Sequence, residues 1–302
     1  MLDVNLLGTG GMVPLPGRYL TALMVRYRGT AVLIDCGEGT QTAIRAAGLG
    51  FKQIGVLCLT HFHADHTAGI PGLLLSIGNS GRTEPLTVIG PKCVEQVVQC
   101  LCVIASQLPF DVNFIELGDG GGERVLTIGS LTISAHPVEH RIPTYAYRLE
   151  LARQGRFDTD KALALGVPVT CWKRLQEGEA VESGGRTIHP ADVLGAPRRA
   201  VKLCYATDLR PAASLAAFAA GADLFICEGI YGDPELLDKA ALHRHCHFAE
   251  AARMAKEAGA AELWLTHFSP SMLDPMEYLR TAADIFPNVR IGQNAATLRF
   301  TD

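Results

Sequence analysis

The sequence predicts an α/β protein in which helices cover a β-sheet. Apolar runs of strand length alternate along the chain with longer segments that have the spacing of amphipathic helices. Several runs, such as AVLIDC at 31–36, are apolar throughout, as is typical of strands covered on both sides. The chain has 302 residues, of which 48% are hydrophobic and 19% are charged, so it can bury a large core and does not belong to the disordered class.

Charge and cysteine usage narrow the class of protein further. The formal net charge is −4, so a polyanion would have to be held by a local positive patch rather than by the whole molecule. The nine cysteines are odd in number and form no CxxC pair, which favours free thiols in a reducing cytosol over a disulfide framework. We recognise no signal peptide and no apolar run long enough to cross a bilayer. We therefore expect a cytoplasmic protein with no membrane partner.

The first half of the chain is predicted to consist mainly of strands separated by glycine-rich turns. The expected strands are 2–8, 21–29, 30–36, 54–60, 86–90, 112–117, 123–129, 131–138 and 144–151. The expected helices are 39–48, 67–81 and 93–107. In the first helix, we expect Thr40 to be the N-cap and Gly48 to end the helix.

The composition changes between residues 152 and 200. This segment is polar, rich in Arg, Lys, Gly and Pro, and has little regular pattern, so we expect an insertion or projecting arm there. Strands and helices alternate again after it. The expected strands are 201–208, 222–229 and 262–268, and the expected helices are 211–221, 233–244, 248–259 and 275–286.

Four ionisable side chains follow the apolar run 54–60 within THFHADH: His61, His63, Asp65 and His66. In an extended turn the first two point the same way, while the last two would face the opposite side of the same pocket. Such a stretch can bind two metal ions, and imidazole and carboxylate ligands suit zinc. The alternative is a set of surface histidines before a helix that Asp65 caps.

THFHADH matches the H-x-H-x-D-H motif of the metallo-β-lactamase superfamily, and within it the chain resembles the ribonuclease Z family, which matures the 3′ end of transfer RNA. The resemblance spans nearly the whole chain. It also includes LLGTGG at 6–11, LIDCGEGTQ at 33–41, GIPGLL at 69–74, RTEPLTVIGP at 82–91 and LWLTHFSP at 263–270. The resemblance implies an αββα sandwich, with two β-sheets packed face to face and helices outside. It implies one domain over 1–302, with a projecting substrate-binding arm at about 152–200.

The resemblance further implies two Zn²⁺ ions per chain. Their ligands would be His61, His63, Asp65, His66, His140, Asp208 and His267. His136, four residues before His140, is the main alternative for the same role. Asp208 would bridge both metals, although it could instead cap the helix near Pro211. All these residues follow strand-like runs, at the ends where α/β proteins commonly build their sites.

A second implied group would assist departure of the ribose oxygen. Glu228, in CEGIYGD, would orient His245, in LHRHCHFAEAA. Asp65 would accept or orient the proton of the attacking water, in an in-line hydrolysis of a phosphodiester. His243 and His247 flank His245, and the three histidines could instead form a solvated helix N-terminus.

The expected arm contains eight basic and six acidic side chains. The family uses an arm in this position to grip transfer RNA through phosphate contacts, and we expect Arg153, Arg156, Lys173 and Arg174 to do so here. The family arm carries a Gly-Pro pair after GVP, whereas this chain continues as GVPVTCWKRLQEG. Trp172 could replace part of that contact by stacking, or it could pack the arm on the body of the protein.

The predicted function is therefore that of a dizinc endoribonuclease that removes the 3′ trailer of precursor tRNA. One alternative is a hydrolase with the same metals and another phosphodiester or ester as substrate. The other is a metal-containing RNA-binding protein without turnover. The resemblance also implies a homodimer.

Overall fold

The computed structural model describes residues 1–105, 107–118, 120 and 123–301. The chain divides into two compact units. Met1–Glu150 and Lys202–Asp302 form the first, which we call the body, and Leu151–Val201 form the second, which we call the arm. The expected arm at about 152–200 falls within the second unit. A single domain with a substrate-binding arm stays a prediction.

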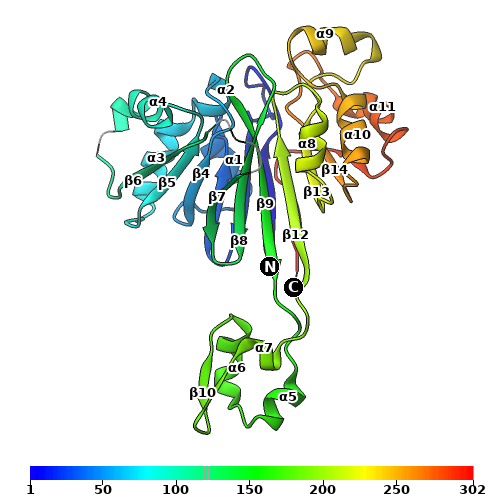
Figure 1. Cartoon of the computed structure of the whole chain (residues 1–302). Coiled ribbons are helices and arrows are strands. Elements are labelled where there is room, and N and C mark those ends of the chain that lie inside the picture. The colour runs from blue at the N-terminus through cyan, green and yellow to red at the C-terminus, as the bar shows by residue number, and fades with distance from the viewer. Residues whose placement is uncertain (106, 119, 121–122, 302) are drawn as a thin grey trace. The chain divides into compact units, whose positions relative to one another are not determined.

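The first sheet of the body has seven strands, most of which are buried. Their order is β16 (Ala296–Phe300), β1 (Leu2–Gly8), β2 (Ala22–Tyr27), β3 (Thr30–Ile34), β4 (Ile54–Cys58), β5 (Leu86–Gly90) and β6 (Val112–Glu116). The strands from β3 to β6 are parallel, and β1 is antiparallel to both of its neighbours. Helices α1 (Thr40–Ala46), α3 (Ile70–Asn79) and α4 (Val94–Leu101) connect the parallel strands and share a buried core with them (Figure 1).

The second sheet also has seven strands. Their order is β15 (Val289–Ile291), β14 (Leu263–Thr266), β13 (Leu224–Glu228), β12 (Arg198–Ala206), β9 (Thr144–Arg153), β8 (Leu131–Val138) and β7 (Glu123–Ile128). The strands from β12 to β15 are parallel. Three helices cover this sheet and form the second buried core of the body with it (Figure 1): α8 (Ala213–Phe218), α10 (Phe248–Glu257) and α11 (Leu279–Ala283).

The two sheets face each other between these helices, so the predicted αββα sandwich is confirmed. Two hydrogen bonds tie the sheets together beside the histidine motif. The Tyr147 hydroxyl donates to the Leu59 carbonyl at 2.8 Å, and the Tyr145 N–H donates to the Thr60 carbonyl at 3.0 Å. The second sheet is therefore bonded directly to the chain segment that enters THFHADH.

Several predicted elements differ from the structure in detail. The helix expected at 67–81 begins only at Ile70, as α3, and a separate short helix, α2 (Ala64–Thr67), precedes it; between the two, the Gly69 N–H donates to the Cys36 carbonyl at 2.9 Å. The N-cap of α1 is Gly39, with φ 86°, and not Thr40, whose hydroxyl donates to the Gly37 carbonyl. Strands β15 and β16 were not predicted. Short 3₁₀ turns begin or end other helices, at Cys102–Ala105, Pro234–Leu236 before α9 (Leu237–Leu242), and Pro275–Tyr278.

The arm is more regular than its composition predicts. It contains α5 (Thr159–Ala164), α6 (Val169–Gln176), α7 (Pro190–Val193) and the hairpin of β10 (Val181–Ser183) and β11 (Arg186–Ile188). Its buried core consists of Ala162, Val167, Leu175, Val181, Ile188 and Val193. The sequence shows little regular pattern here because these apolar residues are too widely spaced along the chain. Trp172 packs within the arm, with its ring against Phe157 and its indole N–H donating to the Val167 carbonyl at 3.0 Å.

None of the helices within the described ranges is both long and apolar enough to cross a membrane.

Candidate metal centre

The seven predicted metal ligands all lie in the body, beyond the ends of strands that come from both sheets. Three residues near these strand ends have positive φ angles: Asp35 at 60°, Asp208 at 55° and His267 at 58°. Such backbone conformations are unfavourable for side chains other than glycine and are often found at functional sites, where the surrounding structure maintains them. Here each conformation turns a polar side chain inward, immediately after a buried strand.

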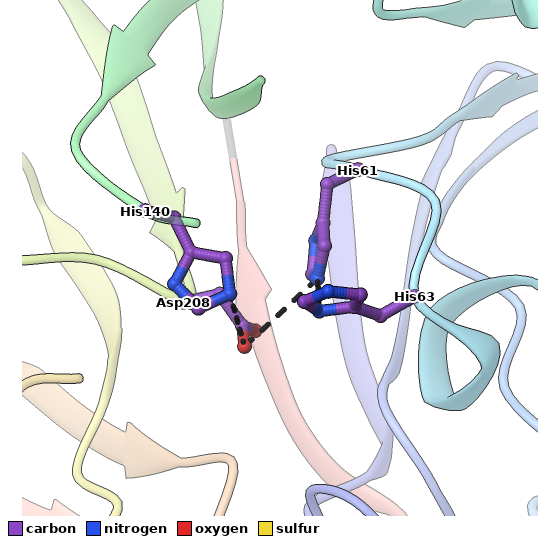
Figure 2. Close-up of side chains that lie close together, drawn as sticks. All are labelled: His61, His63, His140 and Asp208. Atoms are coloured by element: carbon purple, nitrogen blue, oxygen red, sulfur yellow. Dashed lines mark hydrogen bonds and ion pairs between the residues drawn. The ribbon is translucent and has the colours of Figure 1, made fainter. Parts of the chain in front are cut away.

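Asp208 lies beside a first group of three imidazoles (Figure 2). One ligand atom from each of His61, His63, His140 and Asp208 lies within 4.8 Å of the others. Asp208 Oδ1 is 3.9 Å from His61 Nε2 and 3.7 Å from His140 Nε2. His63 Nδ1 is 2.9 Å from His61 Nε2. The structure thus brings His140, and not His136, next to the histidines of the motif.

A second group lies on the other side of the same carboxylate. Asp65, His66 and His267 offer ligand atoms within 4.8 Å of one another. Asp208 Oδ2 is 3.0 Å from His66 Nε2 and 3.2 Å from His267 Nε2. Asp208 therefore presents one oxygen to each group, as a carboxylate that bridges two metal ions would. The assignment of these seven residues as ligands stays a prediction.

Asp35 orients this centre, although the sequence analysis gave it no role. Its Oδ2 is 2.8 Å from His66 Nδ1, and it accepts hydrogen bonds from the Thr60 N–H and hydroxyl at 2.8–3.0 Å. The Thr60 oxygen is in turn 3.0 Å from His61 Nδ1. In its neutral form, each of these imidazoles therefore carries its proton on Nδ1, which leaves the Nε2 lone pairs of His61 and His66 directed at Asp208. The only sequence signal was a carboxylate at the end of a wholly apolar strand.

Two further imidazoles, those of His140 and His267, also contact acceptors through Nδ1. His140 Nδ1 is 3.0 Å from the Arg244 carbonyl, and His267 Nδ1 is 3.4 Å from Glu228 Oε2. The His140 proton is thus directed away from Asp208, whereas His267 Nδ1 has an ion-pair contact but no hydrogen bond among the described residues. His140 Nε2 and Asp208 Oδ2 are buried, and neither makes a hydrogen bond among the described residues.

When the rings are neutral, these contacts leave lone pairs facing one another without protons between them. Buried acceptors that face acceptors are unfavourable unless a cation lies between them. Imidazole nitrogen and carboxylate oxygen are the ligands that zinc and similar divalent metals take in proteins. The donor set therefore fits bound metal cations.

The electric field at the centre also favours positive charge. Burial alone would lower the pKa of His66, but the carboxylates of Asp35 and Asp208 outweigh burial and raise that pKa to about 10. For His61, burial and the nearby His66 dominate, and they hold its pKa well below the usual value. The centre therefore stabilises a cation beside His66, whether a proton or a metal, while His61 keeps a free lone pair.

Glu228 and His245 form the predicted hydrogen-bonded pair. Glu228 is fully buried, and its Oε2 is 3.0 Å from His245 Nδ1. Its other oxygen accepts the N–H groups of Leu209 and Cys246 at 2.7 and 2.9 Å. Burial would lower the pKa of His245, but the Glu228 carboxylate outweighs it and raises that pKa. The Glu228 carboxylate therefore stabilises the protonated ring, and because it contacts Nδ1, Nε2 is the nitrogen left to act as a proton donor.

Three further histidines, which the sequence left as alternatives, have different environments. His136 stacks on Phe218 with ring centroids 5.1 Å apart, outside both ligand groups. His247 is the buried N-cap of α10, where its Nδ1 accepts the Ala249 N–H and its Nε2–H donates to the Asp233 carbonyl. His243 lies at the wall of a cavity, within reach of Arg141. The three neighbouring histidines therefore do not form one solvated helix end.

The centre opens into a cavity of about 510 Å³ in the body. Its floor contains ligand candidates, and its walls include Met12, Ile230, Tyr231 and Pro270. The loop at 9–12 closes one side, because the Met12 N–H donates to Asp65 Oδ2 at 2.7 Å. Gly11 is required there, since a Cβ at this position would lie 2.6 Å from the His267 ring.

The four predicted substrate-binding residues belong to the arm. Arg156, Lys173 and Arg174 are exposed, and Arg153 is half-buried. Arg174 forms an ion pair with Glu179 at 2.9 Å. Their role in substrate binding stays a prediction.

Comparisons with known proteins agree with this architecture. Residues 30–268 match the family model of the beta-lactamase superfamily domain. The ribonuclease Z of Lachnoclostridium phytofermentans is 49% identical over 302 residues, covering 99% of each chain. That of Agathobacter rectalis is 49% identical over 298 residues, covering 99% of this chain and 98% of its own. The crystal structure of the short form of human tRNase Z superposes with a TM-score of 0.69 at 22% identity, covering 99% of this chain and 100% of that one, which shows the shared fold.

This chain and the two ribonucleases Z align over nearly their full lengths and have close to half of their residues in common. Together with the matched superfamily domain, this assigns the family of the chain. The chain belongs to the ribonuclease Z family of the beta-lactamase superfamily.

Proposed function

We propose that this chain is a dizinc endoribonuclease that acts in the cytoplasm and removes the 3′ trailer of precursor tRNA. The observation that carries the proposal is the position of Asp208, whose two oxygens face two separate groups of histidines. His61, His63 and His140 would hold one zinc ion with Asp208. Asp65, His66 and His267 would hold the other. The relatives named ribonuclease Z support the choice of substrate.

Two metals bound here would lower the pKa of a water molecule and neutralise charge on the phosphoryl group. The protein's own groups would handle the protons. Asp65 Oδ2 borders the cavity and is fixed by the Met12 N–H, so it can orient the attacking water or accept its proton.

His245 would protonate the leaving 3′ oxygen. Its ring lines the cavity, and Glu228 holds its Nδ1 while favouring the protonated form. Donation would come from Nε2, after which the Glu228 carboxylate keeps the ring in position for the next proton. Arg210 also fixes this segment, because its guanidinium donates to the His245 carbonyl and forms a bidentate ion pair with Glu250.

The arm would bind the RNA through its phosphates. Replacing Arg153, Arg156, Lys173 and Arg174 by glutamine should raise KM for precursor tRNA, because each substitution removes a cation that contacts a phosphate. Each lost contact should also reduce the slope of log affinity against log salt by about 0.7–0.9. Steady-state kinetics at several salt concentrations measure this effect. Arg186→Gln, on β11 of the same arm, is the control and should behave as wild type. An equal loss on bis(p-nitrophenyl) phosphate would show instead that the arm is only structural.

We also propose that the chain is a homodimer. Three large apolar side chains, one on α3 and two on the 3₁₀ turn Cys102–Ala105 after α4, support a partner surface: Leu75, Val103 and Ile104 are 39%, 73% and 80% exposed. Light scattering after size exclusion should give twice the chain mass, and Ile104→Arg should shift it toward the monomer. A wild-type monomer at micromolar concentration would contradict the proposal.

The substrate is tested by offering purified protein a 3′-extended tRNA transcript and bis(p-nitrophenyl) phosphate. We expect a single cut that leaves a 3′ hydroxyl on the tRNA, and a loss of about 10²–10⁴-fold in turnover for His245→Ala. Cleavage of the small diester alone would indicate a hydrolase with another substrate. Bound metal and bound RNA without turnover on either would indicate a binding protein.

A further inference from the structure

Two exposed cations on the cavity wall are not neutralised. Arg141 and Lys239 both line the cavity, and no carboxylate among the described residues lies within 4.0 Å of either charged group. The neighbouring cations differ, because Arg210 is paired with Glu250 and Arg244 donates to the His140 carbonyl. Asp65 and Asp208, the carboxylates of the lining, face the histidines of the floor. The wall therefore keeps two positive charges that an anion could neutralise.

The two cations are held on the same wall by specific contacts. Arg141 Nη2 donates to His243 Nδ1 at 2.9 Å, and the His243 N–H donates to the Lys239 carbonyl at 3.1 Å, one helical turn earlier in α9. Lys239 Nζ lies 5.0 Å from the centre of the Tyr231 ring, a cation–π distance. Since a guanidinium can only donate, His243 Nδ1 accepts, and its Nε2–H is free to donate to the same anion.

This wall adjoins the proton donor. Arg141 directly follows His140, His243 lies two residues before His245, and the rings of His140 and His245 are 5.3 Å apart. An anion held by the wall would thus lie on the side where the leaving oxygen departs. In a polynucleotide, that oxygen belongs to a nucleotide with its own 5′ phosphate.

We propose that Arg141 and Lys239 form a second phosphate subsite, which holds the phosphate adjacent to the scissile one on the leaving-group side. The subsite rests on the proposed function, because it names a further contact of the same substrate. It would make the enzyme prefer a polynucleotide to an isolated phosphodiester.

Three variants test the subsite: Arg141→Gln, Lys239→Gln and the double variant, with Lys256→Gln on the solvent side of α10 as the matched control. The readout is the ratio of kcat/KM on a 3′-extended tRNA to kcat/KM on bis(p-nitrophenyl) phosphate. Each single substitution should lower this ratio by about tenfold, as for loss of a charge-assisted contact. The salt slope on RNA should fall by about 0.7–0.9 per substitution. The control should change neither quantity, and metal content should report intact folding.

Removing the negative charge of one RNA phosphate at a time identifies the phosphate that the subsite binds. One substrate carries a neutral methylphosphonate at the phosphate preceding the leaving nucleotide, and a second carries it on the trailer side. The first change should slow wild type and have little further effect on the double variant, whereas the second should affect both equally. The subsite proposal is overturned if the methylphosphonate at the first position slows the double variant as much as it slows wild type. It is also overturned if the ratio of kcat/KM on tRNA to kcat/KM on the small diester is unchanged in the variants. If wild type cleaves the small diester but not the tRNA, the proposed function fails, and the salt slope for binding a single-stranded RNA oligonucleotide then decides the subsite alone.

Discussion

Asp35→Asn would test how the protein prepares its imidazoles for metal. Asparagine has nearly the same shape, and it tolerates the positive φ of 60° at this position better than most residues. The substitution changes the hydrogen-bonding pattern and removes the negative charge of Asp35, while the shape of the side chain is kept. The Asp35 carboxylate accepts from the Thr60 N–H at one oxygen and from His66 Nδ1 at the other, both at 2.8 Å.

An amide cannot satisfy both of these donors. If its oxygen accepts the Thr60 N–H, its NH₂ group faces His66 Nδ1, and the His66 proton must move to Nε2. Nε2 is then no longer a free ligand toward Asp208, from which it lies 3.0 Å away. If the amide is flipped, a donor faces the Thr60 N–H instead. Loss of such an orienting partner typically lowers metal affinity by about 10–100-fold, or about 1.4–2.7 kcal/mol.

The affinity is measured by chelator competition, followed by elemental analysis of each variant. We expect Asp35→Asn to lose the metal of the second group preferentially, since His66 belongs to it. Asp3→Asn is a matched control, because Asp3 is also buried but pairs with Arg26 and Arg299, in β2 and β16. Wild-type metal affinity in Asp35→Asn would refute the argument that Asp35 sets the tautomer.

Three further predictions concern the centre and its surroundings. Asp208→Asn should lower the content of both metals while His140→Ala lowers mainly one, as elemental analysis would show; full loading of the first variant would remove the bridging role. Glu228→Gln should move the basic limb of the kcat–pH profile to lower pH, because His245 must be protonated to donate and the Glu228 carboxylate raises the pKa of His245. If the basic limb does not move, His245 is excluded as the proton donor. His247→Ala should lower the free energy of unfolding, measured with urea, by about 1 kcal/mol, because the α10 cap is lost. Its kcat should stay near that of wild type, and a large fall in kcat would assign the donor role to His247.

Much of the fold was predictable because its strands are locally distinct. The ranges 2–8 and 131–138 coincide with β1 and β8, since each strand is a continuous run of the expected residue types. β15 has three residues, too few to form a pattern. β16 alternates between half-buried and exposed positions at the edge of its sheet, so its apolar pattern is weak. Edge strands of this kind depend on partners distant in the sequence, as the pairing of Leu2 with Phe300 illustrates.

The candidate centre was predictable to the extent that its residues are contiguous. THFHADH places four candidate ligands in one short segment, and the family resemblance supplied the others. Asp35 and Thr60 could not be assigned, because their role depends on contacts across 25 to 31 residues. The wall formed by Arg141 and Lys239 likewise comes from segments about a hundred residues apart, and only the packing of α9 beside the cavity brings them together.

The central claim is that two metals, bridged by Asp208, make this chain a nuclease. It is tested most directly by adding Zn²⁺ stepwise to metal-free protein while measuring cleavage of a 3′-extended tRNA. The account predicts no cleavage without metal and a rise that saturates at about two equivalents per chain. Cleavage by the metal-free protein, or saturation at one equivalent, would contradict it.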